Sequence, residues 1–211
     1  MPPTEQAPPS PHPRHFRAGL AAWALALACG FGWLISYQMR AGAPADAPAS
    51  WPAAAALPLD PQRCNLVMFA HPKCPCSGAS LEELKIVLTQ GRGEIRSTLC
   101  FFDPEGAPAD WAQTSLVREA SGIPGLNVVI DRNGAIAEKF GAMTSGQVLM
   151  FDGQGRRVFS GGITGARGHA GDNRGRNLVL ALANGEACES AQTPVFGCAL
   201  HDAADPGKAR P

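Results

Sequence analysis

The sequence predicts an α/β protein, in which helices flank a central mixed sheet, attached to one N-terminal transmembrane helix. Two observations give this prediction. An uncharged apolar run occupies residues 18–37, and short apolar runs of strand length alternate with helical patterns between residues 63 and 163. Strands that alternate with helices are typical of parallel pairing, and two successive strands at the end add an antiparallel edge.

The N-terminal run predicts a membrane span over residues 18–38, because about 20 apolar residues cross a bilayer as a helix. Two arginines precede the run and one follows it, which favours a cytoplasmic segment 1–17. A cleaved signal peptide is the alternative, since Ala41-Gly42-Ala43 resembles a cleavage site. The uncleaved anchor is favoured because the apolar run exceeds the length of a signal-peptide core.

Three further segments follow the span. Residues 39–62 are rich in alanine and proline and predict an extended linker. Residues 63–185 predict the folded domain, and residues 186–211 a cysteine-containing tail. The 18 basic and 18 acidic residues cancel, and no basic run occurs, so we expect no nucleic-acid partner.

The domain elements are predicted in chain order from apolar runs and helix signals. Strands are expected at 65–70, 95–102, 127–131, 147–151 and 157–160. One helix is expected after the first strand, with Ser80 and Glu83 as a capping box and Gly91 as its end. Another is expected to begin at Asp110, and shorter ones at 135–140 and 177–184.

Seven cysteines bear on the compartment, at positions 29, 64, 74, 76, 100, 188 and 198. Cys29 lies in the predicted span, and the even number outside it suits an oxidising compartment. We therefore expect an inner-membrane protein with one span and a periplasmic domain. Cys100 lies in an apolar run and is expected to be buried. Cys188 and Cys198 are candidates for a structural disulfide, and a resolving role for Cys198 against Cys74 is the alternative.

The candidate site is Cys74-Pro75-Cys76, where the first strand gives way to a helix. Unpaired amides and the helix dipole favour a thiolate there, and His71 and Lys73 can add positive charge. A thiolate with a second thiol nearby can attack a disulfide and then be released from it. A bridge between residues two apart closes a small, strained ring, which predicts an oxidising or isomerase-like couple.

The order of elements over residues 63–163 resembles the thioredoxin-like superfamily, and the single anchor is similar to membrane-anchored TlpA-type members. The motifs HPKCPC, TSGQVL and GGITGARGH also resemble bacterial RedB-like proteins. The resemblance implies that Cys74 is the attacking cysteine and that Ser77 stands where the family has its second one. It also places Gly146 at the family's cis-proline, with Thr144 and Ser145 facing Cys74.

The leading hypothesis is a thiol-disulfide oxidoreductase or isomerase that acts on cysteines of exported proteins, with Cys74 as nucleophile and Cys76 as resolver. This chemistry requires no cofactor. The alternative is a copper(I) carrier that resembles Sco-type chaperones, with Cys74, Cys76 and His71 as ligands. Against it, Sco-type proteins have three residues between their cysteines, Cys-x-x-x-Cys, and carry a distal histidine before the late strand, where Ser145 and Gly146 stand in this sequence. A peroxidase is disfavoured because His71 replaces the threonine of the peroxiredoxin pattern.

Overall fold

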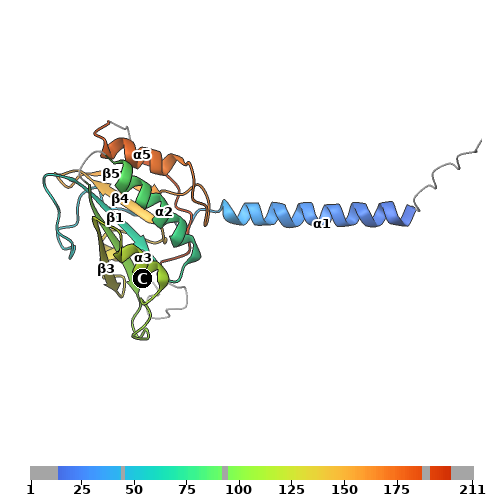
Figure 1. The fold of residues 1–211 in the computed structure, drawn as a ribbon, viewed down its shortest axis with the longest axis horizontal. Coiled ribbons are helices and arrows are strands. Elements are labelled where there is room, and N and C mark those ends of the chain that lie inside the picture. The colour runs from blue at the N-terminus through green and yellow to red at the C-terminus, as the bar shows by residue number, and fades with distance from the viewer. Residues whose placement is uncertain (1–13, 44–45, 92–94, 187–190, 201–211) are drawn as a thin grey trace, which may run out of the picture. The chain divides into compact units, whose positions relative to one another are not determined.

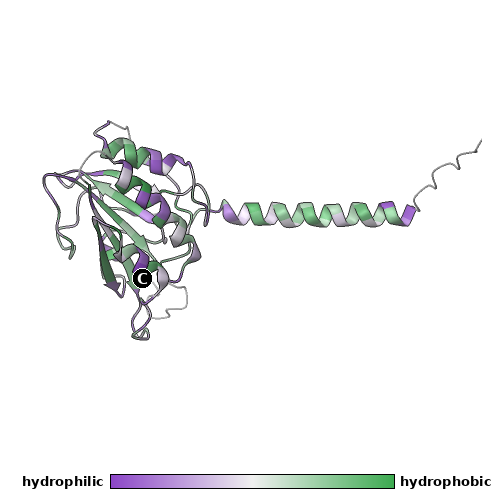
Figure 2. Ribbon diagram, viewed as in Figure 1, coloured by the Kyte–Doolittle hydropathy of each residue, from purple (hydrophilic) through white to green (hydrophobic). Residues whose placement is uncertain are grey.

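The computed structural model describes residues 14–43, 46–91, 95–186 and 191–200. The chain divides into two compact units, residues 1–37 and residues 38–211. Helix α1 (Arg14–Gln38) has no buried residue and is mostly apolar, with hydrophilic residues near its ends (Figure 2). Within the described ranges it is the one helix long and apolar enough to cross a membrane, as the sequence predicts.

The second unit contains six strands and four helices within the described residues (Figure 1). In chain order they are β1 (Cys64–Ala70), α2 (Pro75–Gln90), β2 (Ile95–Asp103), α3 (Ser115–Ser121), β3 (Leu126–Arg132), α4 (Ala135–Lys139), β4 (Gln147–Phe151), β5 (Arg157–Gly162), α5 (Arg174–Ala183) and β6 (Ala191–Gln192). The strands form one sheet in the order β3-β2-β1-β4-β5-β6.

The sheet is mixed, and β1 lies inside it. Strand β1 pairs in parallel with β2, and β2 pairs in parallel with β3. On the other side β1 pairs antiparallel with β4, which forms a hairpin with β5. The short strand β6, which the sequence did not predict, joins β5 in parallel. The predicted α/β class with a closing antiparallel edge is confirmed.

Two apolar layers cover the faces of the sheet. Side chains alternate along β1, so Leu66 and Met68 face one layer while Val67 and Phe69 face the other. The first layer contains the apolar faces of α2, α3 and α5, and the second contains α4. Because both faces of β1 are buried, its sequence is a continuous apolar run instead of an alternating one.

The segment predicted as an extended linker is packed against the domain. Trp51 makes edge-to-face contacts with Phe140 and Phe151, at ring-centroid distances of 5.1 and 5.2 Å. Leu57 is buried in the same apolar layer. The compact unit therefore begins near Gln38 and not at residue 63. Alanine and proline content predicted an irregular backbone, but the three aromatic rings decide that it is held in place.

Two helix starts differ from the prediction. Helix α2 begins at Pro75, so Ser80 and Glu83 lie in its interior instead of forming a capping box. Glu83 is fully buried and its carboxylate pairs with Arg176 of α5 at 2.9 Å. Helix α3 begins at Ser115, because the Thr114 hydroxyl accepts the Val117 N–H and so caps the helix later than Asp110.

Candidate active site

The site forms where the chain leaves β1 and enters α2. His71 and Pro72 follow the strand, and a bond from the Cys74 N–H to the His71 carbonyl closes the turn at 3.1 Å. Cys74 is the extended N-cap residue of α2, and Pro75 takes the first helical position. Proline suits that position because the first helical amides have no partner in the helix. The turn thereby fixes the Cys74 sulfur at the helix N-terminus.

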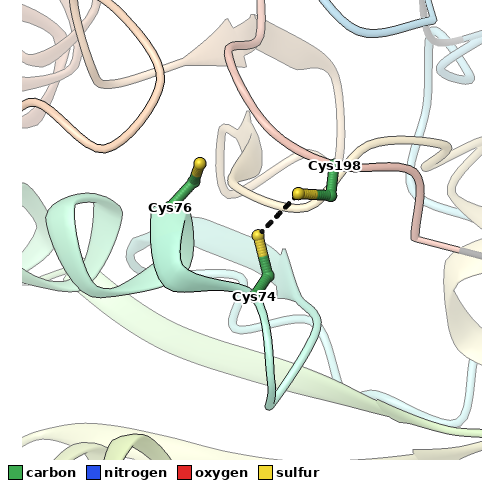
Figure 3. A group of neighbouring side chains, drawn as sticks. All are labelled: Cys74, Cys76 and Cys198. Atoms are coloured by element: carbon green, nitrogen blue, oxygen red, sulfur yellow. Dashed lines mark hydrogen bonds between the residues drawn. The ribbon is translucent and has the colours of Figure 1, made fainter.

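Three thiols converge at this point (Figure 3). The Sγ atoms of Cys74 and Cys198 lie 3.2 Å apart and point toward each other. The Sγ atoms of Cys74, Cys76 and Cys198 all lie within 4.8 Å of one another. Cys76 stands on the first turn of α2, whereas Cys198 comes from the C-terminal segment that follows β6. The fold therefore brings a distant cysteine to the predicted nucleophile.

Cys74 is the thiol that ionises most readily. Burial acts to raise its pKa, but hydrogen bonds outweigh that effect and hold the pKa below the usual value. The Cys198 thiol is the largest of these contributions, followed by the backbone amides of Cys198 and Cys76 and then by the Ser77 side chain. Donors that point at a sulfur favour its charged form, so Cys74 is the thiol of the cluster that ionises first.

The other two thiols of the cluster have raised pKa values. Burial and the nearby Cys74 charge raise the pKa of Cys76. Burial and the hydrogen bond to Cys74 raise the pKa of Cys198 to about 12, although the positive charge of Arg167 acts the other way. The pKa shifts therefore separate Cys74, which loses its proton most readily, from two thiols that hold theirs more firmly.

The loop before β4 contacts the site differently from the prediction. The Ser145 hydroxyl accepts the His71 N–H at 2.9 Å and shares a hydrogen bond with the Ser77 hydroxyl at 2.8 Å. Its own N–H donates to the Cys198 carbonyl at 2.9 Å. Thr144 instead turns its hydroxyl to the Ala43 carbonyl. Ser145 therefore contacts the neighbours of Cys74, and Thr144 ties the loop to the N-terminal part of the domain.

Gly146 has a structural reason to be glycine. Its φ of +91° lies in the region that favours glycine, and a Cβ there would lie 2.7 Å from the Ser80 hydroxyl. Its N–H donates to the Phe69 carbonyl at 2.7 Å. No cis peptide bond occurs among the described residues. The glycine lets this loop approach α2 closely while it stays bonded to the end of β1.

His71 and Lys73 lie beside the thiolate but are engaged with other groups. The His71 Nδ1 accepts the Lys73 N–H at 3.1 Å, and its ring meets the edge of Trp111 at a centroid distance of 5.5 Å. The Lys73 ammonium lies 3.9 Å from the centre of the Trp111 ring. Trp111 was not predicted, since no local pattern links it to a turn so far away in the chain.

A groove of about 440 Å³ opens next to Cys74. Residues 72–75 and Gly78 form one wall, and the first turn of α3 with Glu119 forms the other. Cys74 itself is only 6% exposed. The groove therefore reaches Cys74 and its neighbours in the sequence, but surrounding residues leave little of Cys74 exposed.

The remaining cysteines lie apart from this cluster or outside the description. Cys100 is buried as predicted, and burial followed by the Asp131 charge raises its pKa. Cys64 begins β1, and its pKa is also raised, by burial and then by Asp152. Cys188 lies outside the described residues, so its predicted pairing with Cys198 stays a prediction. The position of Cys198 instead corresponds to the alternative, a partner for Cys74.

Comparison with known proteins gives similarity at the level of the fold. The sequence matches no protein-family profile and no curated protein. An uncharacterized conserved protein from Geobacillus kaustophilus is similar in structure, with a TM-score of 0.57 and 16% identity, over 75% of this chain and 96% of that one. A hypothetical protein from Sinorhizobium meliloti 1021 has a TM-score of 0.54 and 18% identity, over 77% and 97%.

A third solved structure is more distant. A secreted disulfide oxidoreductase of Mycobacterium tuberculosis has a TM-score of 0.43 and 12% identity, over 60% of this chain and 84% of that one. The two higher scores establish a shared fold and nothing about activity. Together with the order and directions of the strands, they agree with the predicted thioredoxin-like fold, a central mixed sheet flanked by helices.

Proposed function

We propose that this protein is a membrane-anchored thiol-disulfide oxidoreductase whose nucleophile is Cys74. The observation that carries the proposal is the Cys74 sulfur at the N-terminus of α2, with another thiol 3.2 Å away and with hydrogen bonds that lower the pKa of Cys74. A thiolate of this kind attacks one sulfur of a disulfide, and a nearby thiol completes the exchange. Its substrates are cysteine-containing exported proteins in the periplasm.

The couple is proposed to be oxidising. Donors to the Cys74 sulfur stabilise the thiolate, which exists only in the reduced protein. Stabilising the reduced form makes a disulfide a stronger oxidant. The protein therefore passes its disulfide to substrate thiols, and in a glutathione buffer it also shuffles mispaired disulfides.

The test is disulfide exchange by the full chain in detergent, with scrambled ribonuclease as the substrate. Cys74→Ser should abolish the recovery of active ribonuclease, because the attacking sulfur is gone. Gly165→Ala is the matched control, since a Cβ at Gly165 meets only the Asn173 Cβ at an ordinary 3.7 Å. Full activity in Cys74→Ser would contradict the proposal.

A second candidate function is a copper(I) carrier, and the three-sulfur cluster favours it. Thiolates are soft ligands that suit copper(I), and the Sγ atoms of Cys74, Cys76 and Cys198 lie within 4.8 Å of one another. His71, which the copper hypothesis expected as the third ligand, is not part of that group. Metal binding would release protons from Cys76 and Cys198, whose pKa values are raised in the free protein.

Competition against a copper(I) chelator separates the two functions. The carrier predicts one tightly bound copper(I) per reduced chain, lost in Cys198→Ser and kept in Cys100→Ala, which removes a buried thiol outside the cluster. If the wild-type chain binds copper(I) no more tightly than Cys198→Ser does, the carrier is excluded and the oxidoreductase remains.

A further inference from the structure

We infer that Cys198, and not Cys76, is the redox partner of Cys74, and that residues 195–200 act as an internal substrate that a protein substrate displaces from Cys74. This inference deepens the proposed function and rests on it. We call residues 195–200 the covering segment, because they bring Cys198 against Cys74, which is only 6% exposed. A protein disulfide cannot reach a sulfur that is covered in this way, so the cover belongs to the mechanism.

The covering segment is bound as a strand would be. The Ser145 N–H donates to the Cys198 carbonyl at 2.9 Å, and the Leu200 N–H donates to the Met143 carbonyl at 2.9 Å. Between these bonds Thr144 and Ala199 form an antiparallel bridge. An extended peptide that adds to a free backbone edge makes the same kind of contacts. The edge of residues 143–145 therefore holds a cysteine-containing peptide, and in this structure that peptide is the protein's own.

The fit of the segment depends on Gly197. A Cβ at this position would overlap the Ser145 carbonyl oxygen, which is backbone and cannot move aside cheaply. The φ of Gly197 is not in the left-handed region, so the requirement is for space and not for conformational freedom. Leu200 at the far end is only 1% exposed. The small residue lets the segment approach closely enough to place Cys198 on Cys74.

Geometry favours Cys198 over Cys76 as the partner. The Cys74 and Cys76 sulfurs lie within 4.8 Å of each other, but a bridge between residues two apart closes a small, strained ring. The Cys74 and Cys198 sulfurs already face each other at 3.2 Å (Figure 3). A bond between them needs an approach of only about 1 Å, to the usual S–S length of about 2.0 Å.

Oxidation of a substrate takes two successive attacks by substrate thiolates. In the oxidised protein a substrate thiolate attacks the Cys74 sulfur, the Cys74–Cys198 bond breaks, and Cys198 leaves and takes up a proton. A second substrate thiolate then attacks the substrate sulfur bonded to Cys74, which leaves as the stabilised thiolate. The substrate has lost two electrons and the protein has gained them. Oxidised glutathione in the buffer restores the Cys74–Cys198 bond and is itself reduced to two thiols.

The same edge serves the segment and the substrate in turn. Release of Cys198 frees the Met143 carbonyl and the Ser145 N–H, which are the groups that an incoming extended peptide would use. When residues 195–200 return, they displace that peptide. Occupancy of the edge therefore controls access to Cys74.

The first test maps the disulfide. The full chain in detergent is oxidised with oxidised glutathione, blocked, and cleaved after Lys, Arg and Glu, which separates Cys188 from Cys198 and keeps Cys74 with Cys76 in one fragment. We expect a cross-linked fragment pair that joins Cys74 to Cys198. It should persist in Cys76→Ser and in Cys188→Ser and disappear in Cys74→Ser. A bridge within the Cys74–Cys76 fragment, with Cys198 free, would overturn the inference.

The second test measures access. In reduced Gly197→Ala, labelling of Cys74 by a bulky thiol reagent should rise by about tenfold, because the segment leaves the edge more often. The matched glycine variant, Gly165→Ala, should label like the wild type. If Gly197→Ala does not fold, as judged by circular dichroism, a chain that ends at Pro194 replaces it and should label equally fast. Unchanged labelling in folded Gly197→Ala would overturn the proposed cover.

The two proposals fail in different ways. If the Cys74–Cys198 bond forms and Gly197→Ala exposes Cys74, yet no protein disulfide is exchanged, the inference stands and the proposed function falls. If ribonuclease is exchanged equally fast by Cys198→Ser, the proposed function stands and the inference falls. The inference expects a loss of about tenfold in that variant, because a tethered thiol is replaced by thiols in solution.

Discussion

At the scale of the residue, the chemistry rests on which of three sulfurs carries the charge. The pKa of Cys74 is lowered because the Cys198 thiol, two backbone amides and the Ser77 side chain outweigh the effect of burial. Burial first, and then the interaction with Cys74, raises the pKa of Cys76 and of Cys198. The placement of hydrogen-bond donors therefore gives the proposed nucleophile a lower pKa than the two potential resolving thiols.

We predict that Cys198→Ala raises the pKa of Cys74. A lowered pKa means that, as the pH falls, the Cys74 thiolate is lost at a lower pH than an ordinary thiolate would be. Without the Cys198 thiol, burial is less strongly opposed, so the titration moves to higher pH. The measurement is the pH midpoint of thiolate absorbance or of alkylation at Cys74, since the absolute rate also changes with exposure. Cys64→Ala, which removes a thiol at the start of β1, is the control; an equal midpoint in wild type and Cys198→Ala would contradict the prediction.

At the scale of the element, α2 is held to α5 by a buried ion pair. Glu83 is 0% exposed, and its carboxylate meets Arg176 at 2.9 Å and accepts the Gly171 N–H at 2.5 Å. Arg176 also reaches Asp172 at 2.8 Å. Since the N-terminus of α2 positions Cys74, this pair anchors the helix that carries the site.

Arg176→Met should lower the free energy of unfolding by about 3 kcal/mol or more, because it leaves the Glu83 carboxylate buried without its partner. Adding Glu83→Leu should recover most of the loss, because the uncompensated charge is removed with it. Urea unfolding midpoints give the comparison. Lys85→Met is the control on the same helix, where a more exposed pair with Glu82 is worth about 1 kcal/mol or less. Equal losses in Arg176→Met and Lys85→Met would contradict the prediction.

At the scale of the whole molecule, the chain has two units with separate roles. Helix α1 is long and mostly apolar, and it has no buried residue. The compact unit of residues 38–211 contains the sheet and all three cysteines of the cluster. The apolar helix and the unit that contains the cysteine cluster can therefore be separated at Gln38. A cut at residue 63 would instead remove Trp51 and Leu57 from an apolar layer.

We predict that the full chain stays in the membrane pellet after alkaline extraction and that a chain beginning at Gln38 is released. Protease added to intact spheroplasts should cleave the domain of the full chain, since the proposed orientation is periplasmic. The shorter chain should form the same Cys74–Cys198 bond, because every contact of the covering segment lies within residues 38–211. A protected domain in spheroplasts, cleaved only after lysis, would contradict the proposed orientation.

The sequence alone predicted the long apolar helix, the fold class and the place of Cys74 at a helix start, because these depend on local signals. An uncharged run, alternating strands and helices, and a Cys-Pro-Cys at a helix start are each read within a few residues. It did not determine that Glu83 is buried, because its partner Arg176 lies on another helix. Residues 39–62 were predicted to be a free tether for the same reason, since the aromatic contacts of Trp51 are distant in sequence.

Only the tertiary structure decided which thiols meet. Six cysteines allow 15 pairings, and no spacing rule connects Cys198 to Cys74 across 124 positions. The edge at residues 143–145 and the space left by Gly197 bring them together. Local residue order fixes the backbone preference of each segment, whereas contact between distant segments depends on how the whole chain buries its apolar faces. The position of the proposed nucleophile is therefore determined by the local sequence, whereas its proposed partner is determined by the tertiary fold.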